Sequence, residues 1–294
     1  MKVTASQVKE LRERTGAGMM DCRKALVESD CDLDAAVEVL RKAGAAKAAK
    51  KAGRVAAEGL VDAAVMTDGT AVLVEVNCET DFVARNDNFR AFVEDIKNTV
   101  ASDGANGVAA KVDTARTELV ATIGENIKVR RAERFAGDGA NFAYVHPGNR
   151  IAVILQLQGG NDSNALSTFG KDLCFHIAAM NPLCTSPDDV PADVIEQEKR
   201  IAREQLLAEG KPEAMIDKII PGKLKRFFKD RCLLNQEAAM GDDGVTNQAL
   251  LDALVKTIDT PVQVSAFMRY ELGEGIEKKE DNLAAEVAAM TGGA

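Results

Sequence analysis

The sequence has no tryptophan and only two tyrosines and two histidines among its 294 residues. Proteins that bind single-stranded nucleic acid usually stack the bases on aromatic side chains, so the shortage of Tyr and Trp argues against such a platform. A net charge of −9 also disfavours a polyanion as the main partner. The two histidines, His146 and His176, leave few groups for general base catalysis near neutral pH.

Familiar catalytic and nucleotide-binding motifs are missing as well. The chain has no G-x-x-x-x-G-K-[ST] loop, no G-x-G-x-x-G, no G-x-S-x-G elbow and no H-E-x-x-H. Its six cysteines include no C-x-x-C pair, which does not suggest a zinc site. There is no signal peptide and no apolar run of 18 residues, so we expect a cytoplasmic protein with reduced thiols and no membrane partner. We predict that the chain is not an enzyme and needs no cofactor or metal.

Residues 1–54 predict a three-helix module similar to the ubiquitin-associated fold, which usually serves as a binding device. Thr4 and Gln7 fit a capping box, Asp32 is placed to cap the third helix, and Gly44 is predicted to end it.

A small, basic segment follows, from Ala45 to Gly59. We interpret it mainly as a solvated helical linker. The alternative is a nucleic-acid or phosphate contact through its cations. These cations are Lys47, Lys50, Lys51 and Arg54.

Two similar units predict an α+β fold with a duplicated core of antiparallel sheet plus helix. In residues 55–139, the runs LVDAAVMT and TAVLVEVNC flank Asp68-Gly69, a strong hairpin signal, and an amphipathic helix and the strand IKVRRAERF follow. The pattern returns in residues 140–185 plus 231–275, where ANFAYV and NRIAVILQLQ flank a turn and VQVSAFMRYEL supplies the last strand. We match Val72–Cys78 with Ala152–Gln158. His146 falls in the second hairpin turn, and His176 is expected to be a satisfied core residue.

A protruding antiparallel coiled-coil hairpin is predicted for residues 186–230, because two long charged helices share only a narrow apolar seam. Pro221 should kink the second of these helices. A short C-terminal helix in residues 276–294 presents Met290 on its apolar side.

The loop NCETDFVARND places a carboxylate, Asp81, beside a large apolar ring, Phe82, where a strand gives way to a helix. Phe82 could instead tuck under its own sheet, and Asp81 could simply cap the turn, with Thr80 as the competing cap. Met19 and Met20 follow a glycine turn, where flexible apolar side chains suit an interface; the alternative is that they fill the module's core.

Three long motifs resemble the bacterial elongation factor Ts family. They are KELRERTGAGMMDCRKAL with KAAKKAG after it, NCETDFVARND, and GEGIEKKEDNLAAEVAAM. This resemblance covers essentially the whole chain in order. It departs from the family pattern at Pro221 and in the stretch NQEAAMGDD.

The resemblance implies a guanine nucleotide exchange factor in translation elongation that binds the GTPase elongation factor Tu, both GDP-bound and nucleotide-free. By the same route, an element of four residues would intrude near the partner's Mg²⁺ site; its members are Thr80, Asp81, Phe82 and Val83. Other contact residues implied by the resemblance are Arg12, Met19 and Met20 and, less sharply, His146 and Met290. Two other functions stay open: an RNA-binding protein that uses the basic segment, and an adaptor that self-associates through the core or the coiled-coil arm.

Overall fold

The computed structural model describes residues 2–277, which form eleven α-helices, two short 3-10 helices and six strands. The helices are α1 (Ala5–Thr15), α2 (Met19–Glu28), α3 (Leu33–Lys51), α4 (Asp81–Ala84), α5 (Asp87–Asp103), α6 (Val108–Lys111), α7 (Asp113–Ile123), α8 (Ser163–Met180), η1 (Pro187–Asp189), α9 (Ala192–Ala208), α10 (Glu213–Arg231), η2 (Leu233–Asn235) and α11 (Asn247–Ile258). The strands are β1 (Glu58–Val65), β2 (Ala71–Cys78), β3 (Lys128–Phe135), β4 (Ala140–Val145), β5 (Ile151–Gly159) and β6 (Val262–Glu271). The α+β class is confirmed, and the predicted C-terminal helix with Met290 lies outside the described residues.

The strands form two antiparallel sheets, ordered β1-β2-β3 and β4-β5-β6. Both predicted hairpins are present, with Val65 opposite Ala71 at the first turn and Val145 opposite Ala152 at the second. The predicted last strand, β6, pairs with β5 along its length. In each sheet the central strand therefore has a partner on both sides, and it is also the most deeply buried strand.

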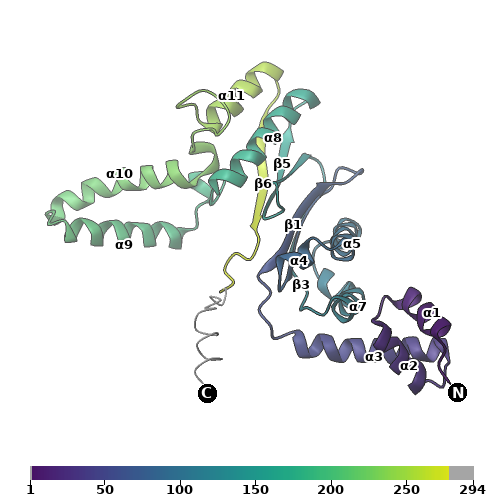
Figure 1. Cartoon of the computed structure of the whole chain (residues 1–294). Coiled ribbons are helices and arrows are strands. Elements are labelled where there is room, and N and C mark those ends of the chain that lie inside the picture. Colours follow the sequence, from purple (N-terminus) through teal and green to yellow (C-terminus); the bar gives the residue numbers. More distant parts are fainter. Residues whose placement is uncertain (1, 278–294) are drawn as a thin grey trace.

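The two sheets pack face to face between two layers of helices (Figure 1). Alternate residues of β2 point to opposite faces, so that Val72 and Val74 pack against α5 while Leu73 faces the second sheet. In β5, Val153 packs against α8 and Ile154 faces the first sheet. Both central strands thus contribute to two cores, which explains why they read as nearly continuous apolar runs.

The two sheets also share an irregularity in the middle strand. A bulge follows Glu75 in β2 and Gln156 in β5. The helix-facing positions at the start of these strands are Val72 and Val153. The predicted match of Val72 with Ala152 is therefore wrong by one residue, because a shift of one residue exchanges the two faces of a strand.

The N-terminal helices are stabilised by the predicted caps. Thr4 and Gln7 form a reciprocal capping box, and the Asp32 carboxylate accepts the backbone N–H of Ala35 at 2.9 Å. The prediction that Gly44 ends the third helix is wrong, since α3 continues to Lys51. A Cβ at Gly44 would lie 3.1 Å from that of Ala121, so this glycine allows α3 to pack closely on α7 instead of stopping it.

The helices α9 and α10 form the predicted antiparallel hairpin and project away from both sheets (Figure 1). Its seam buries Ala202, Leu206 and Ile216. Cys184 and Cys232 lie at its base with their sulfur atoms 3.7 Å apart, and all six cysteines carry free thiols.

One helix, α11, was not anticipated from the sequence. It follows the polar loop around Met240 and begins where the Thr246 side chain accepts the backbone N–H of Ala249 at 3.2 Å. Leu251 and Ile258 pack against α8 in the second core. The spacing of apolar residues in this segment is typical of a helix, but the preceding Asp/Gly-rich loop makes this pattern hard to recognise.

The carboxylate of Glu75, which is fully buried, joins the two sheets. It accepts hydrogen bonds from Arg130 at 2.9 Å and Arg131 at 2.5 Å on β3, from Asn77 at 3.1 Å, and from the backbone N–H of Gly273 just beyond β6 at 2.8 Å. Burial alone would raise the pKa of Glu75, but these hydrogen bonds outweigh it and leave the pKa below its usual value.

His176 is a satisfied core residue, as predicted. Its Nδ1 accepts the backbone N–H of Ala239 at 3.1 Å, so the ring proton is on Nε2 and is donated to Gln236 at 2.9 Å. Asn247 lies beside the ring, with its Nδ2 3.0 Å from Nε2, and donates to the carbonyl of Leu233 at 2.8 Å. Burial lowers the pKa of His176, although the Gln236 contact opposes this. A buried, neutral His176 surrounded by amide groups does not indicate a proton-transfer role in catalysis.

We predict that Glu75→Ala lowers the free energy of unfolding by about 3–5 kcal/mol, because it leaves two arginines without their buried counter-charge. Denaturant titration measures this change. Glu204→Ala, which removes an exposed carboxylate from α9, is the matched control and should stay within about 0.5 kcal/mol of the parent. Equal effects of the two substitutions would contradict a joining role for Glu75.

We also predict that His176 makes stability depend on pH. Below about pH 6.5, His176 becomes protonated in the unfolded chain, whereas its lowered pKa keeps it neutral to a lower pH in the folded chain. The contribution of neutral His176 is therefore complete above pH 6.5 and is lost as the pH falls toward the folded pKa. Thermal melts from pH 7.5 to 5.5 should show a falling Tm that His176→Asn flattens.

Candidate partner-binding site

The loop NCETDFVARND, here called the signature loop, contains a single helical turn, α4, which begins shortly after β2 ends. Its first two residues, Asp81 and Phe82, face solvent, and the Phe82 side chain is 77% exposed. Its last two residues, Val83 and Ala84, are buried in the core shared with α5. The alternative in which Phe82 tucks under its own sheet is therefore wrong. Val83 serves as the apolar anchor of the turn.

Neither polar residue of the turn acts as its cap. Thr80 occupies the N-cap position but makes no capping hydrogen bond, because its hydroxyl donates to Glu125 at 2.7 Å. The Asp81 carboxylate pairs with Arg85, one turn further on, at 2.9 Å. Both side chains of this pair are largely exposed, and such pairs contribute only about 0.3–0.5 kcal/mol. Asp81 can thus exchange Arg85 for a group of a partner at little cost.

A pair of carboxylates binds this turn to the segment that follows α7. Glu125 accepts the backbone N–H groups of Glu79 at 3.1 Å and Thr80 at 2.9 Å. Glu79 in return accepts the backbone N–H of Asn126 at 2.6 Å and pairs with Arg54 at 3.3 Å. Reasoning from the sequence missed these groups. The only sequence signal is the acid-amide pair directly after the helix-ending Gly124.

Met19 and Met20 begin α2 and expose 59% and 61% of their surfaces. The alternative in which both fill the module's core is therefore wrong, since that core is formed around Leu11, Cys22 and Leu26. Met20 also borders a shallow groove of about 320 Å³ shared with Val27, which is exposed as well. This end of α2 is an apolar surface with flexible side chains.

The remaining predicted contact residues lie on other elements. Arg12 is exposed in the last turn of α1, and His146 is exposed in the β4–β5 turn with its Nδ1 3.0 Å from the Tyr144 hydroxyl. The predicted residues are thus distributed over the N-terminal module, the first sheet unit and the second hairpin. Their roles stay predictions.

Most cations of the basic segment are engaged within the protein. Lys47 pairs with Asp21 at 2.7 Å, Lys51 donates to the carbonyl of Gly124, and Arg54 pairs with Glu79. The hydrogen bond from Lys47 lowers the pKa of Asp21, against a smaller opposing effect of burial. These contacts fasten α3 to its neighbours and compete with any use of the segment for nucleic acid.

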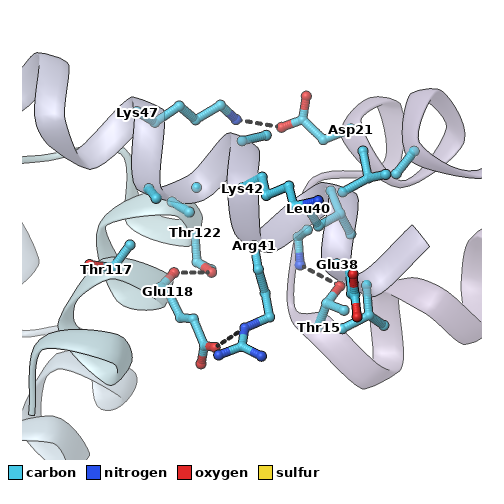
Figure 2. A pocket seen from close by; sticks show the side chains of 18 of the residues that line it. Thr15, Asp21, Glu38, Leu40, Arg41, Lys42, Lys47, Thr117, Glu118 and Thr122 are labelled. Carbon is cyan, nitrogen blue, oxygen red and sulfur yellow. Dashed lines mark hydrogen bonds and ion pairs between the residues drawn. The ribbon is translucent and has the colours of Figure 1, made fainter. Parts of the chain in front are cut away.

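A hollow of about 770 Å³ is lined by residues of the N-terminal helices, mainly α2 and α3, and by residues of α7 (Figure 2). Opposite charges meet across it: Arg41 lies 3.6 Å from Glu118, and Lys47 reaches Asp21. Because side chains of both signs line this hollow, it does not indicate a ligand of one charge. Across residues 2–277, no cluster of His, Cys, Asp and Glu is arranged to hold a metal, and no helix is long and apolar enough to cross a membrane.

Comparison with known proteins places this chain in a family. The family described as Elongation factor TS matches residues 79–274, which include α4 with Asp81 and Phe82, strand β3 and the whole second sheet. The elongation factor Ts of Clostridium perfringens (strain SM101 / Type A) is 48% identical across 99% of both chains. That of Alkalilimnicola ehrlichii is 46% identical across the full length of both, and that of Nitratiruptor sp. is 46% identical across 99% of both. The chain belongs to the elongation factor Ts family of translation elongation factors.

Proposed function

We propose that this protein is a guanine nucleotide exchange factor that binds elongation factor Tu and accelerates the release of GDP, so that GTP can bind. The observation that carries the proposal is the exposed Phe82 ring on a turn whose other side is anchored in the core. Single exposed apolar residues are common on protein surfaces. Phe82, however, lies next to the weakly paired carboxylate of Asp81. Both residues belong to NCETDFVARND, one of the motifs that resemble the elongation factor Ts family.

Exchange of this kind needs no covalent chemistry. A protein that binds the nucleotide-free GTPase better than the loaded form must weaken nucleotide binding by the same factor, because binding free energies are reciprocal. We therefore propose that the chain acts as a binding protein and not as an enzyme. The buried, neutral His176 is consistent with that role.

In the proposed mechanism, Phe82 inserts between elements of the GTPase and displaces groups that organise its Mg²⁺ site. Mg²⁺ demands near-octahedral coordination, so a small displacement weakens its binding. Asp81 leaves Arg85 and presents its carboxylate to partner groups that otherwise serve the ion. Burial of one Phe side chain is worth about 1.5–3 kcal/mol, or roughly ten- to a hundredfold in an equilibrium constant.

Further contacts are proposed at Arg12, Met19, Met20 and His146. The exposed methionines provide adaptable apolar area at the start of α2, and His146 provides a polar contact on the second hairpin. We further infer that the three N-terminal helices form the ubiquitin-associated-like module, that the two sheet units are copies of one unit, and that α9 and α10 act as a coiled-coil arm. The RNA-binding alternative loses support because three of its four cations are engaged within the protein.

We predict that Phe82→Ala slows release of a fluorescent GDP analogue from elongation factor Tu by roughly ten- to a hundredfold at equal concentration, because it removes the buried ring from the complex. Asp81→Ala should also slow release. Stopped-flow fluorescence measures both. Met240→Ala removes a half-exposed apolar side chain from a distant loop and should behave like the parent.

Thermal melts complete this test. Phe82→Ala should leave the Tm nearly unchanged because its ring is exposed, whereas Phe89→Ala in the same motif region should cost about 3–5 kcal/mol because its ring is fully buried. If the parent protein does not accelerate GDP release, the proposed function is wrong. If Phe82→Ala is folded and as active as the parent, exchange does not depend on this ring.

A further inference from the structure

We propose that Glu125 is a positioning residue for exchange: its carboxylate fixes the backbone at the start of α4 and so sets the direction in which Phe82 and Asp81 project. This inference rests on the proposed function. It assigns a role to a residue in the segment after α7, which lies 45 and 46 positions along the chain from Thr80 and Glu79, the residues whose backbone it binds.

The geometry of the Glu125 carboxylate is specific to this turn. One oxygen accepts the backbone N–H groups of Glu79 and Thr80, at 3.1 and 2.9 Å, and the other accepts the Thr80 hydroxyl at 2.7 Å. Thr80 is the N-cap residue of α4, and Glu79 precedes it, so Glu125 holds the two residues that lead into the helix. In a capping box the backbone N–H of the N-cap residue is bound by a Glu or Gln at the third helical position. That position is Val83 here, and the acceptor comes instead from a distant residue.

The turn needs an external anchor because it cannot fix its own direction. α4 has only four residues, and a helix of one turn is not stable alone. Its N-cap side chain is turned away, and its exposed ring makes little contact that could hold the backbone. Its supports include the packing of Val83 and Ala84 in the core below, the hydrogen bond from Arg90 to the Ala84 carbonyl at 3.3 Å, and Glu125 at the start of the turn.

The anchor point is itself held firmly. Asn126, next to Glu125, is 5% exposed and donates from its side chain to the carbonyls of Ala52 at 3.4 Å and Arg54 at 2.8 Å. Its backbone N–H goes to Glu79 at 2.6 Å. The segment after β2 and the segment after α7 therefore exchange hydrogen bonds in both directions, and the chain leaving α3 is bound to the same point.

Glu125→Ala removes the anchor, while Glu125→Gln can keep it. The Gln amide oxygen can accept both backbone N–H groups, and its NH₂ can donate to the Thr80 hydroxyl. We expect Glu125→Ala to lower the maximal GDP release rate about tenfold, since small misplacements of acting groups have effects of this size. Glu125→Gln should retain most of the rate. Glu118→Ala removes a half-exposed carboxylate from neighbouring α7 and should retain the full rate.

The measurement is stopped-flow release of a fluorescent GDP analogue from elongation factor Tu over a range of concentrations of the full-length protein. It separates the maximal rate from the half-saturating concentration. Loss of folded protein alone raises the apparent half-saturating concentration and leaves the maximal rate intact. Misdirection of Phe82 lowers the maximal rate itself, so the two effects are distinguishable.

A combined substitution tests whether Glu125 acts through these two side chains. If it does, adding Glu125→Ala to a protein that carries Asp81→Ala and Phe82→Ala should slow release no further. If the fold-changes of the combined substitutions multiply, the inference is wrong. A Glu125→Ala protein with the parent's maximal rate would also overturn it. Either outcome leaves the proposed function intact. A parent protein without activity would overturn the function and the inference together. Should Glu125→Ala fail to fold, Thr80→Val removes only the 2.7 Å hydroxyl contact and should give a smaller loss of maximal rate; a full rate in that variant would overturn the inference.

Discussion

The buried carboxylate of Glu75 is the interaction on which the arrangement of this protein depends. An ionised group taken out of water is tolerated only when its charge and lone pairs are fully compensated. Here the compensation comes from Arg130 and Arg131 on β3 and from the N–H of Gly273, which follows β6 of the second sheet. Arg131 in turn lies 4.0 Å above the ring of Tyr270 on β6. Apolar contact alone would let the sheets slide over each other, whereas this set of directional bonds permits one placement.

The fixed placement of the two sheets extends along β2 to α4, the turn that carries Phe82. Glu75 lies within β2, which ends at Cys78. Glu79 follows directly, and Phe82 lies only a few residues further along the chain. Glu79 then enters the second polar network with Arg54 and Asn126. Two buried or half-buried polar networks therefore lie on one strand. The first fixes the sheet pair, and the second fixes the turn that projects from it. An exposed phenyl ring can act as a wedge only if the backbone behind it does not yield.

Local patterns in the sequence were sufficient for most elements but not for their mutual arrangement. The two hairpins, the helix around Phe89 and the caps at Thr4 and Asp32 follow from periodicity and turn chemistry, which act over a few residues. Gly44 was misread because a glycine in a helix can serve either as a stop or as a point of close packing, and only the position of Ala121 decides between them. The one-residue shift between the two middle strands has the same origin, since which face is buried depends on the opposite sheet. Glu125 could not be assigned at all, because its partners lie about 45 residues earlier in the chain.

The shared anchor at Asn126 has a consequence for how the two proposed contact surfaces work together. Asn126 binds the carbonyls at the end of α3, and α3 carries the helical module with Met19 and Met20. Glu125, the adjacent residue, binds the turn that carries Phe82. Close packing at Gly44, together with the contact of Lys51 with Gly124, fastens the rest of α3 to α7. The apolar surface on α2 and the ring on α4 are therefore tied to the same short segment after α7. A partner that engages the methionines thus meets Phe82 in a defined orientation, and little binding free energy is spent on ordering one surface relative to the other.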